Sequence, residues 1–291
     1  MNVEGREKPH WLRVRAPTGQ FSHVRAVLSQ HRVNSVCDVS QCPNISECWS
    51  RSSATFMILG RICTRSCAFC AVRSGQRGEE VDEGEPARIA RAAWKLGLRH
   101  VVITSVTRDD LHDFGAGHFA ATVDEVRRIN PLAGVEVLVP DFQGSGMAVE
   151  TVIASTPDVF GHNIETVRSL QEAVRDRRAV YENSLAVLSR AKESGDRILT
   201  KSSIMLGLGE ERGELLEAMR DLRAARVDML ALGQYLKPRG SPLEVERYVP
   251  PSEFEELKAE ALKLGFKAVS SGPFVRSSYK AIEMLGSGIG V

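Results

Sequence analysis

All six cysteines of this 291-residue chain lie between Cys37 and Cys70. Such clustering requires a local explanation, either a disulfide framework or a set of metal ligands. Disulfide frameworks are typical of small secreted proteins. This chain has a mass of 32.0 kDa, and its polar N-terminus lacks the apolar segment of a secretory signal. We therefore expect reduced, metal-binding thiols in a cytoplasmic protein.

The overall composition is that of an ordinary globular protein. Apolar residues make up 43% and charged residues 26% of the chain, so a sizeable core can be buried. The formal net charge of +1 provides no global field for gripping a phosphate backbone. No apolar run reaches the ~20 residues that a membrane helix needs. We expect one domain, with neither nucleic acid nor a membrane as a partner.

From residue 56 onward, short β-rich segments alternate with amphipathic helical segments. Repeated β-then-α units require parallel strands with right-handed crossovers, in a doubly wound sheet or in a complete or partial barrel. Periodicity alone does not choose between these folds, but both place the site at the carboxyl ends of the strands. The six strand candidates are Phe56–Leu59, Val101–Ile103, Val135–Leu138, Asp158–Phe160, Ile198–Met205 and Met229–Leu232.

Two of the intervening helices have recognisable end signals. Pro86 opens a helical stretch, and Gly97 is a plausible C-terminal stop for it. Ser252 and Glu255 form an S-x-x-E capping pattern ahead of a second helix, which Gly265 closes.

Cys63, Cys67 and Cys70 form a C-x3-C-x2-C loop directly after the first strand candidate. Thiolates are soft donors that iron–sulfur clusters favour, and three of them ligate three of the four irons of a [4Fe–4S] cluster. One iron is then left open for a small molecule. The alternative is a zinc site, but zinc sites normally pair two C-x2-C units or add histidines, and this loop contains no histidine.

Cys37, Cys42 and Cys48 form a second group with C-x4-C-x5-C spacing. The same count of ligands allows another four-iron cluster. Because no cysteine remains, its fourth iron would need an oxygen or nitrogen donor from elsewhere in the chain.

The motifs resemble those of a known family. The C-x3-C-x2-C loop, with Phe69 before its last cysteine, resembles the radical S-adenosylmethionine superfamily. Its combination with Cys37–Trp49 and with the strand Ala54–Gly60 resembles the lipoyl synthase family. Further similar stretches are Thr104–Leu111, Pro140–Phe142, His162–Val167, Thr200–Ser202, Gly207–Glu210, Gly233–Leu236 and Gly272–Tyr279.

The resemblance implies an α/β fold, a partial (β/α)6 TIM-like barrel with N- and C-terminal extensions that carry the ligands of an auxiliary cluster. The expected divisions are residues 1–52 for the N-terminal extension, 53–272 for the barrel and 273–291 for the C-terminal extension. It also implies that Ser278, in the R-S-S-Y segment, ligates the auxiliary cluster. Serine is a harder donor than cysteine, so that corner of the cluster should be labile.

The implied activity is the attachment of two sulfur atoms to carbons 6 and 8 of an octanoyl chain linked to a lysine of a carrier protein. Aliphatic C–H bonds offer no acidity to a general base, so a cofactor radical must do this work. The implied cofactors are S-adenosylmethionine and two [4Fe–4S] clusters, the auxiliary one being the sulfur source. The implied partners are octanoylated lipoyl carrier domains or a glycine cleavage H-type protein, an electron donor and an iron–sulfur cluster carrier.

Other candidate residues are expected near S-adenosylmethionine. Asn163 and Glu165 follow a strand candidate and could hydrogen-bond this cofactor, with Lys201, Gly207 and Gly209 in the same cavity. Polar residues at strand ends can equally be structural. The charged run of residues 175–178 is either solvated or in contact with an acidic carrier domain.

Two other functions remain open from the residues. An enzyme resembling biotin synthase would leave the C-x4-C-x5-C group and Ser278 without matched roles. An electron carrier or a zinc-stabilised binding module would have no use for a barrel-sized domain or an open iron site.

Overall fold

A computed structural model describes residues 8–14, 16–51, 53–193, 195 and 197–286. Its strands are β1 Asn34–Ser35, β2 Thr55–Ile58, β3 Ile62–Cys63, β4 Arg73–Ser74, β5 His100–Ser105, β6 Gly134–Leu138, β7 Val159–Gly161, β8 Leu199–Leu206, β9 Met229–Gln234 and β10 Ala268–Gly272. Its α-helices are α1 Gly19–Gln30, α2 Val36–Val39, α3 Ile45–Ser50, α4 Glu85–Lys95, α5 Ala116–Ile129, α6 Gly146–Ala154, α7 Gln171–Val174, α8 Tyr181–Glu193, α9 Arg212–Ala224, α10 Pro251–Lys263 and α11 Ala281–Gly286.

The main sheet has the strand order β1-β2-β5-β6-β7-β8-β9-β10. Each strand from β2 to β10 pairs in parallel with the next one along this order, and β1 pairs antiparallel with β2. A doubly wound sheet reverses its strand order at a switch point, and this sheet does not. Within the described residues β1 and β10 do not pair, so the sheet is a partial barrel, as predicted.

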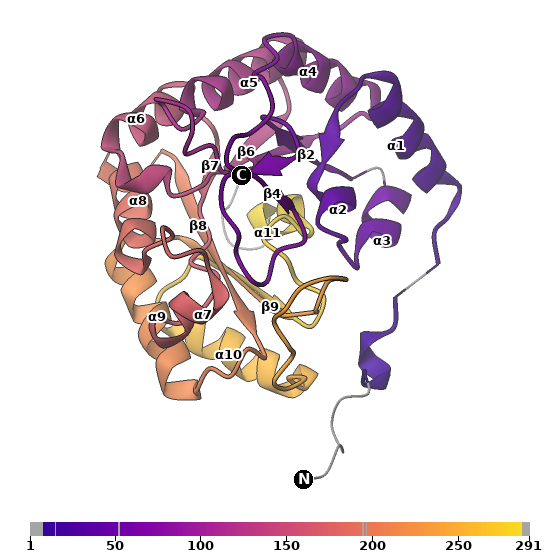
Figure 1. The fold of residues 1–291 in the computed structure, drawn as a ribbon. Helices are drawn as coiled ribbons and strands as arrows, with labels where there is room; N and C mark the ends of the chain where they lie inside the picture. Colours follow the sequence, from indigo (N-terminus) through magenta and orange to yellow (C-terminus); the bar gives the residue numbers. More distant parts are fainter. Residues whose placement is uncertain (1–7, 15, 52, 194, 196, 287–291) are drawn as a thin grey trace.

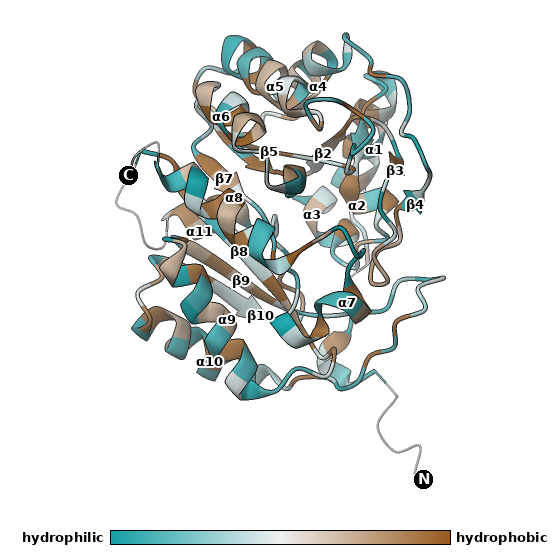
Figure 2. Ribbon diagram, turned by 60° about the vertical axis from the view of Figure 1, so that its left-hand side comes forward, coloured by the Kyte–Doolittle hydropathy of each residue, from teal (hydrophilic) through white to brown (hydrophobic). Residues whose placement is uncertain are grey.

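The helices lie outside the curved sheet. Figure 1 shows α4, α5, α6, α8, α9 and α10 in an arc around the strands, with α1, α2 and α3 near β2 at the other end of the sheet. Most strands are largely apolar, and the helices around them turn polar faces outward (Figure 2). Both faces of a parallel barrel strand are covered, which favours apolar residues. Phe56, Ile103 and Phe160 are fully buried examples. No helix in the described ranges is long and apolar enough to cross a membrane.

All six predicted strands are confirmed, as β2, β5, β6, β7, β8 and β9. The sequence did not reveal β10, whose Ser270, Ser271 and Gly272 lack the apolar character of the other strands. It pairs with β9 along its whole length nonetheless. The predicted N-terminal extension ends before β2, and the predicted C-terminal extension begins after β10. The division of the chain at these points stays a prediction.

The two helix-end predictions have different outcomes. Gly97 and Gly265 follow α4 and α10 with φ of +63° and +94°, as C-terminal glycines do. The capping pattern at Ser252 was wrong, because α10 begins at Pro251 and no side chain caps it. Proline is pre-organised for the first helical position and has no N–H to satisfy there.

Candidate functional site

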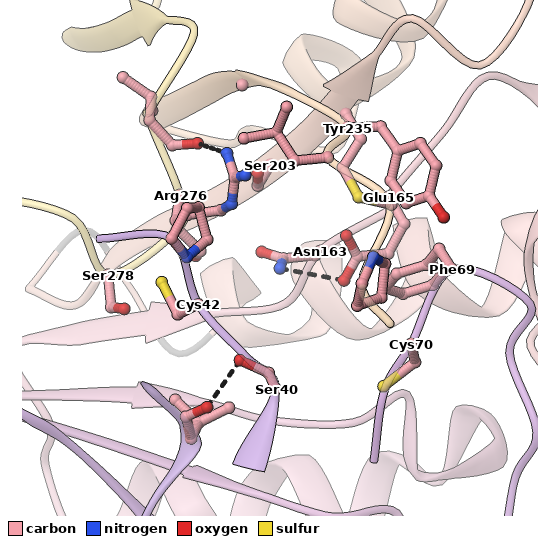
Figure 3. Close-up of a pocket in the computed structure, with 18 of the residues that line it drawn as sticks. Ser40, Cys42, Phe69, Cys70, Asn163, Glu165, Ser203, Tyr235, Arg276 and Ser278 are labelled. Carbon is pink, nitrogen blue, oxygen red and sulfur yellow. Dashed lines mark hydrogen bonds between the residues drawn. The ribbon is translucent and has the colours of Figure 1, made fainter. Parts of the chain in front are cut away.

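The largest convergence of predicted site residues is a cavity at the carboxyl ends of the barrel strands. It is lined from both cysteine groups, from the loop after β7, from β8 and β9, and from the segment after β10. In Figure 3, Cys42 and Ser278 lie at one side of this cavity, and Cys70 and Phe69 lie at the other. The predicted residues that line it are Cys37, Cys42, Phe69, Cys70, Asn163, Glu165 and Ser278.

The C-x3-C-x2-C loop leaves β2 through a tight turn in which Leu59 and Gly60 have φ of +66° and +86°. Each of its three sulfurs accepts one main-chain N–H. The nitrogen of Arg65 donates to Cys63 Sγ at 3.4 Å, that of Val72 to Cys70 Sγ at 3.4 Å, and that of Asp176 to Cys67 Sγ at 3.3 Å. Donors of this kind stabilise a negatively charged sulfur and tune the potential of a cluster bound to it.

Arg65 anchors this loop to its neighbours. Its guanidinium donates to both carboxylate oxygens of Asp109, at 2.9 and 3.0 Å, and to both of Asp141, at 2.7 and 2.6 Å. These carboxylates follow β5 and β6. The Arg65 side chain is only 4% exposed, and the Arg65 contacts hold the pKa of Asp141 below its usual range despite burial. The fork therefore joins the loops after three adjacent strands.

The second cysteine group occupies α2, α3 and the turn between them. Burial is the largest cause that raises the pKa of Cys42 and, to about 12, that of Cys48, and the neighbouring thiol of Cys37 adds to both shifts. In the first loop burial likewise raises the pKa of Cys70 to about 12. Buried thiols of this kind become thiolates when a positive centre compensates their charge, as a metal cluster does.

The segment after β10 reaches the second cysteine group although it is more than 200 residues away in the chain. The side-chain amide of Asn44 donates to the carbonyl of Phe274 at 2.6 Å, and the hydroxyl of Tyr279 donates to Glu47 at 3.1 Å. Gly233 of β9 permits this approach, because a Cβ there would lie 2.0 Å from the carbonyl oxygen of Val275. The R-S-S-Y segment is thereby held beside the cysteines.

Two serine hydroxyls of this segment line the cavity. Ser278, the predicted ligand, forms no side-chain hydrogen bond within the described residues, and its neighbour Ser277 has a buried hydroxyl that is also without a partner there. An unpartnered buried hydroxyl is costly unless another group satisfies it. The observation supports an oxygen ligand from this pair, and the choice of Ser278 stays a prediction.

The donor set fits two iron–sulfur clusters. Six free cysteines form two groups of three, and an oxygen donor accompanies the second group. Soft thiolates with few harder ligands favour iron–sulfur clusters over magnesium or calcium. Among the described residues no three His, Cys, Asp or Glu side chains are arranged to hold a single metal ion. The fit therefore rests on the chemistry and grouping of the donors.

Asn163 and Glu165 lie between the two cysteine groups in the cavity (Figure 3). The Asn163 amide donates to the Glu165 carboxylate at 3.1 Å, while the Asn163 carbonyl oxygen is buried without a partner in the described chain. Burial raises the pKa of Glu165, although the charges of Arg175 and Arg276 and the Asn163 hydrogen bond oppose this shift. The pair offers both donors and acceptors to a polar ligand.

Lys201, Gly207 and Gly209 are not brought to this cavity. Lys201 is fully buried in β8, where its ammonium group donates to Glu136 at 2.8 Å. Gly207 and Gly209 form a turn after β8 with φ of +90° and +107°. The Glu210 carboxylate accepts the Gly207 N–H at 2.7 Å, so this turn is closed by its own contacts.

Sequence reasoning did not identify the anchoring role of Arg65, nor that of Asp141. Arg65 lies inside the cysteine loop and Asp141 lies in the loop after β6, so their positions beyond strand ends were the available signal. Arg276 of the R-S-S-Y segment lies in the cavity wall, near enough to Cys42 and Glu165 for their charges to oppose the lowering of its pKa by burial.

Comparison with known proteins agrees with this geometry. Residues 57–222, more than half of the chain, match the radical SAM superfamily. The chain therefore belongs to the radical SAM superfamily of enzymes.

Curated relatives define the family within that class. The chain is 54% identical over 291 residues to the lipoyl synthase of Pyrobaculum calidifontis, covering 98% of this chain and 99% of that protein. It is 53% identical over 277 residues to the lipoyl synthase of Thermus thermophilus, covering 95% and 86%. The chain belongs to the lipoyl synthase family. This finding favours that family over the biotin synthase-like and non-enzymatic alternatives.

Solved structures support the fold alone. The hydrogenase maturase HydG from Carboxydothermus hydrogenoformans aligns with a TM-score of 0.61 at 12% identity, covering 86% of this chain and 57% of that chain. Methylornithine synthase (PylB) aligns with a TM-score of 0.51 at 13% identity, covering 88% and 82%. The barrel fold is thus shared with these two proteins.

Proposed function

We propose that this cavity inserts two sulfur atoms at carbons 6 and 8 of an octanoyl-lysine on a carrier protein, to form a lipoyl group. The observation that carries the proposal is that both cysteine groups and the R-S-S-Y segment face one cavity. The residues proposed for radical generation and those proposed for the sulfur source thus line the same cavity, which supports the proposal. Family membership with the lipoyl synthases supports the same activity.

The residues have separable roles in this proposal. Cys63, Cys67 and Cys70 hold a [4Fe–4S] cluster that supplies the electron for cleavage of S-adenosylmethionine, and Cys37, Cys42, Cys48 and Ser278 hold the cluster that supplies sulfur. Asn163 and Glu165 hydrogen-bond the polar part of S-adenosylmethionine. Phe69 packs beside it.

The cavity wall also suits an acyl chain. Its lining includes the apolar residues Leu138, Ile204, Met205 and Val275. Apolar walls exclude water and position an alkyl chain without polar contacts. The protein's role is to hold the two reacting carbons of the acyl chain near both clusters and to shield a reactive radical from solvent.

The partners are inferred from this chemistry. The substrate is an octanoylated lipoyl carrier domain or a glycine cleavage H-type protein. An electron donor supplies one electron for each cleavage of S-adenosylmethionine. An iron–sulfur cluster carrier rebuilds the consumed cluster. The six cysteines form no disulfide within the described residues, which supports a reducing, cytoplasmic location.

The direct test is anaerobic incubation of the reconstituted protein with S-adenosylmethionine, reductant and an octanoyl-lysine peptide, followed by mass spectrometry. We expect the peptide to gain two sulfurs and lose two hydrogens, with release of 5′-deoxyadenosine. Deoxyadenosine without any change of the peptide would leave radical generation intact and refute the proposed substrate.

A further inference from the structure

A second depression lies outside the cavity, on the outer side of the C-x3-C-x2-C loop. It is lined by Thr64, Ser66 and the segments 74–76 and 176–178, and we call it the arginine groove. It shares no lining residue with the cavity. Figure 2 shows β3, which carries Cys63, and β4, which follows the loop, at the outer edge of the molecule.

The wall of the arginine groove touches a cluster thiol directly. The main-chain nitrogen of Asp176 donates to Cys67 Sγ at 3.3 Å, and the Asp176 carboxylate accepts the main-chain N–H of Ser66 at 2.9 Å. A molecule bound in the groove is therefore separated from the Cys67 sulfur by a short path through one residue. From the cavity side, the same centre is enclosed by the proposed binding space for S-adenosylmethionine and substrate.

The groove carries an excess of positive charge. Its acidic residue, Asp176, is bound by Arg178 at 2.8 and 3.0 Å, which also holds the pKa of the Asp176 carboxyl far below its usual range. Arg177 lies in the groove, and Arg73 and Arg77 flank its lining segment 74–76 in the chain. All three are exposed and form no ion pair within the described residues. Glu79 and Glu80 follow in the chain but do not line the groove.

Building on the proposed function, we propose that the arginine groove is the docking site of an acidic one-electron donor protein. Each cleavage takes one electron from the donor and delivers it to the sulfonium, whose carbon–sulfur bond breaks to give methionine and a carbon radical. Electron-transfer complexes are small and weak, and complementary charge mainly governs their rate of formation. The arginine groove offers positive charge to an acidic donor, and its wall contacts the thiol of Cys67, a proposed cluster ligand.

An acidic carrier domain is the competing occupant, and the geometry disfavours it. The acyl chain must enter the cavity where Cys70, Glu165 and Ser278 converge, and the groove does not open on that lining. Separate surfaces would let the donor and the carrier bind at the same time, which suits a reaction that needs two electrons in succession from outside.

The test uses the reconstituted holoprotein and the double variant Arg73→Glu/Arg177→Glu, with Arg220→Glu as control. Arg220 is an exposed arginine of α9 without an ion pair in the described chain. Binding of an acidic flavodoxin is measured by calorimetry at low salt. We expect the double variant to bind at least tenfold more weakly, the control to bind like wild type, and added salt to weaken wild-type binding. Equal affinity of the double variant and wild type would overturn the proposal.

Kinetics distinguish this proposal from the proposed function. Deoxyadenosine formation by the double variant should fall at least tenfold with reduced flavodoxin and stay unchanged with dithionite, which needs no docking site. If wild type makes no deoxyadenosine with either reductant, the proposed function fails, while the binding comparison still decides on the groove. If the double variant loses affinity for an octanoylated carrier domain and keeps it for flavodoxin, the groove is a carrier site and the donor proposal is refuted.

Discussion

Replacement of Arg65 by methionine should strongly destabilise the chain. The Arg65 side chain is 4% exposed, and its two carboxylate partners, Asp109 and Asp141, are 7% and 0% exposed. Removing one partner from a buried ion pair leaves uncompensated charge and costs about 3–5 kcal/mol. Because total stabilities are about 5–15 kcal/mol, this loss would be a large part of the whole. Lysine in place of Arg65 should recover only part of it, since one ammonium cannot reproduce the fork.

The assay is anaerobic urea unfolding of the cluster-free protein, followed by circular dichroism. The matched control is Arg247→Met. Arg247 makes a similar two-bond fork with Glu253, at 2.8 and 2.7 Å, but its side chain is 42% exposed. An exposed pair contributes about 0–1 kcal/mol, so this variant should unfold almost like wild type. If Arg65→Met were no more harmful than Arg247→Met, the anchoring role of Arg65 would be refuted.

Three further outcomes are expected. Ser278→Ala should preserve deoxyadenosine formation but impair sulfur insertion and lower the iron bound per chain, as measured by product and metal analysis; normal product formation would exclude this ligand. Gly207→Ala should lower the melting temperature, because φ is +90° and a Cβ would lie 2.2 Å from Gln234 Nε2, whereas Gly213→Ala in α9, with open space around it, should not. Burial lowers the pKa of His162 to about 4, so its contribution to stability is present above pH 6.5 and is lost as the pH falls towards 4. Wild type should therefore lose about 2 kcal/mol more than His162→Gln between pH 7 and 5 in urea unfolding, and equal losses would contradict the assignment.

Much of the fold could be predicted from local sequence, because buried parallel strands are short apolar runs such as Phe56–Leu59. The choice of a barrel could not, since it depends on the order in which strands pair. β10 escaped notice because only its first two residues, Ala268 and Val269, are apolar and buried, whereas Ser270, Ser271 and Gly272 are partly exposed. Ser252 lies inside α10 and does not cap it, because the helix begins one residue earlier at Pro251.

The candidate site was predictable where chemistry is carried by rare residues at fixed spacing. Cysteine grouping fulfils this condition, and the structure brings Cys42 and Cys70 to one cavity. Lys201 shows the opposite case. A lysine in a strand can bind either a ligand or a buried carboxylate. Only the fold reveals that the carboxylate of Glu136 in β6 lies 2.8 Å from the Lys201 ammonium group.

We expect this chain to use its own second cluster as the sulfur source for an octanoyl chain. We would reconstitute the protein with heavy-isotope sulfide, remove the excess, and run a single turnover in buffer that contains unlabelled sulfide. Mass spectrometry of the peptide product should show two heavy sulfurs per lipoyl group. A product that carries only unlabelled sulfur would contradict the claim and assign the second cysteine group another role.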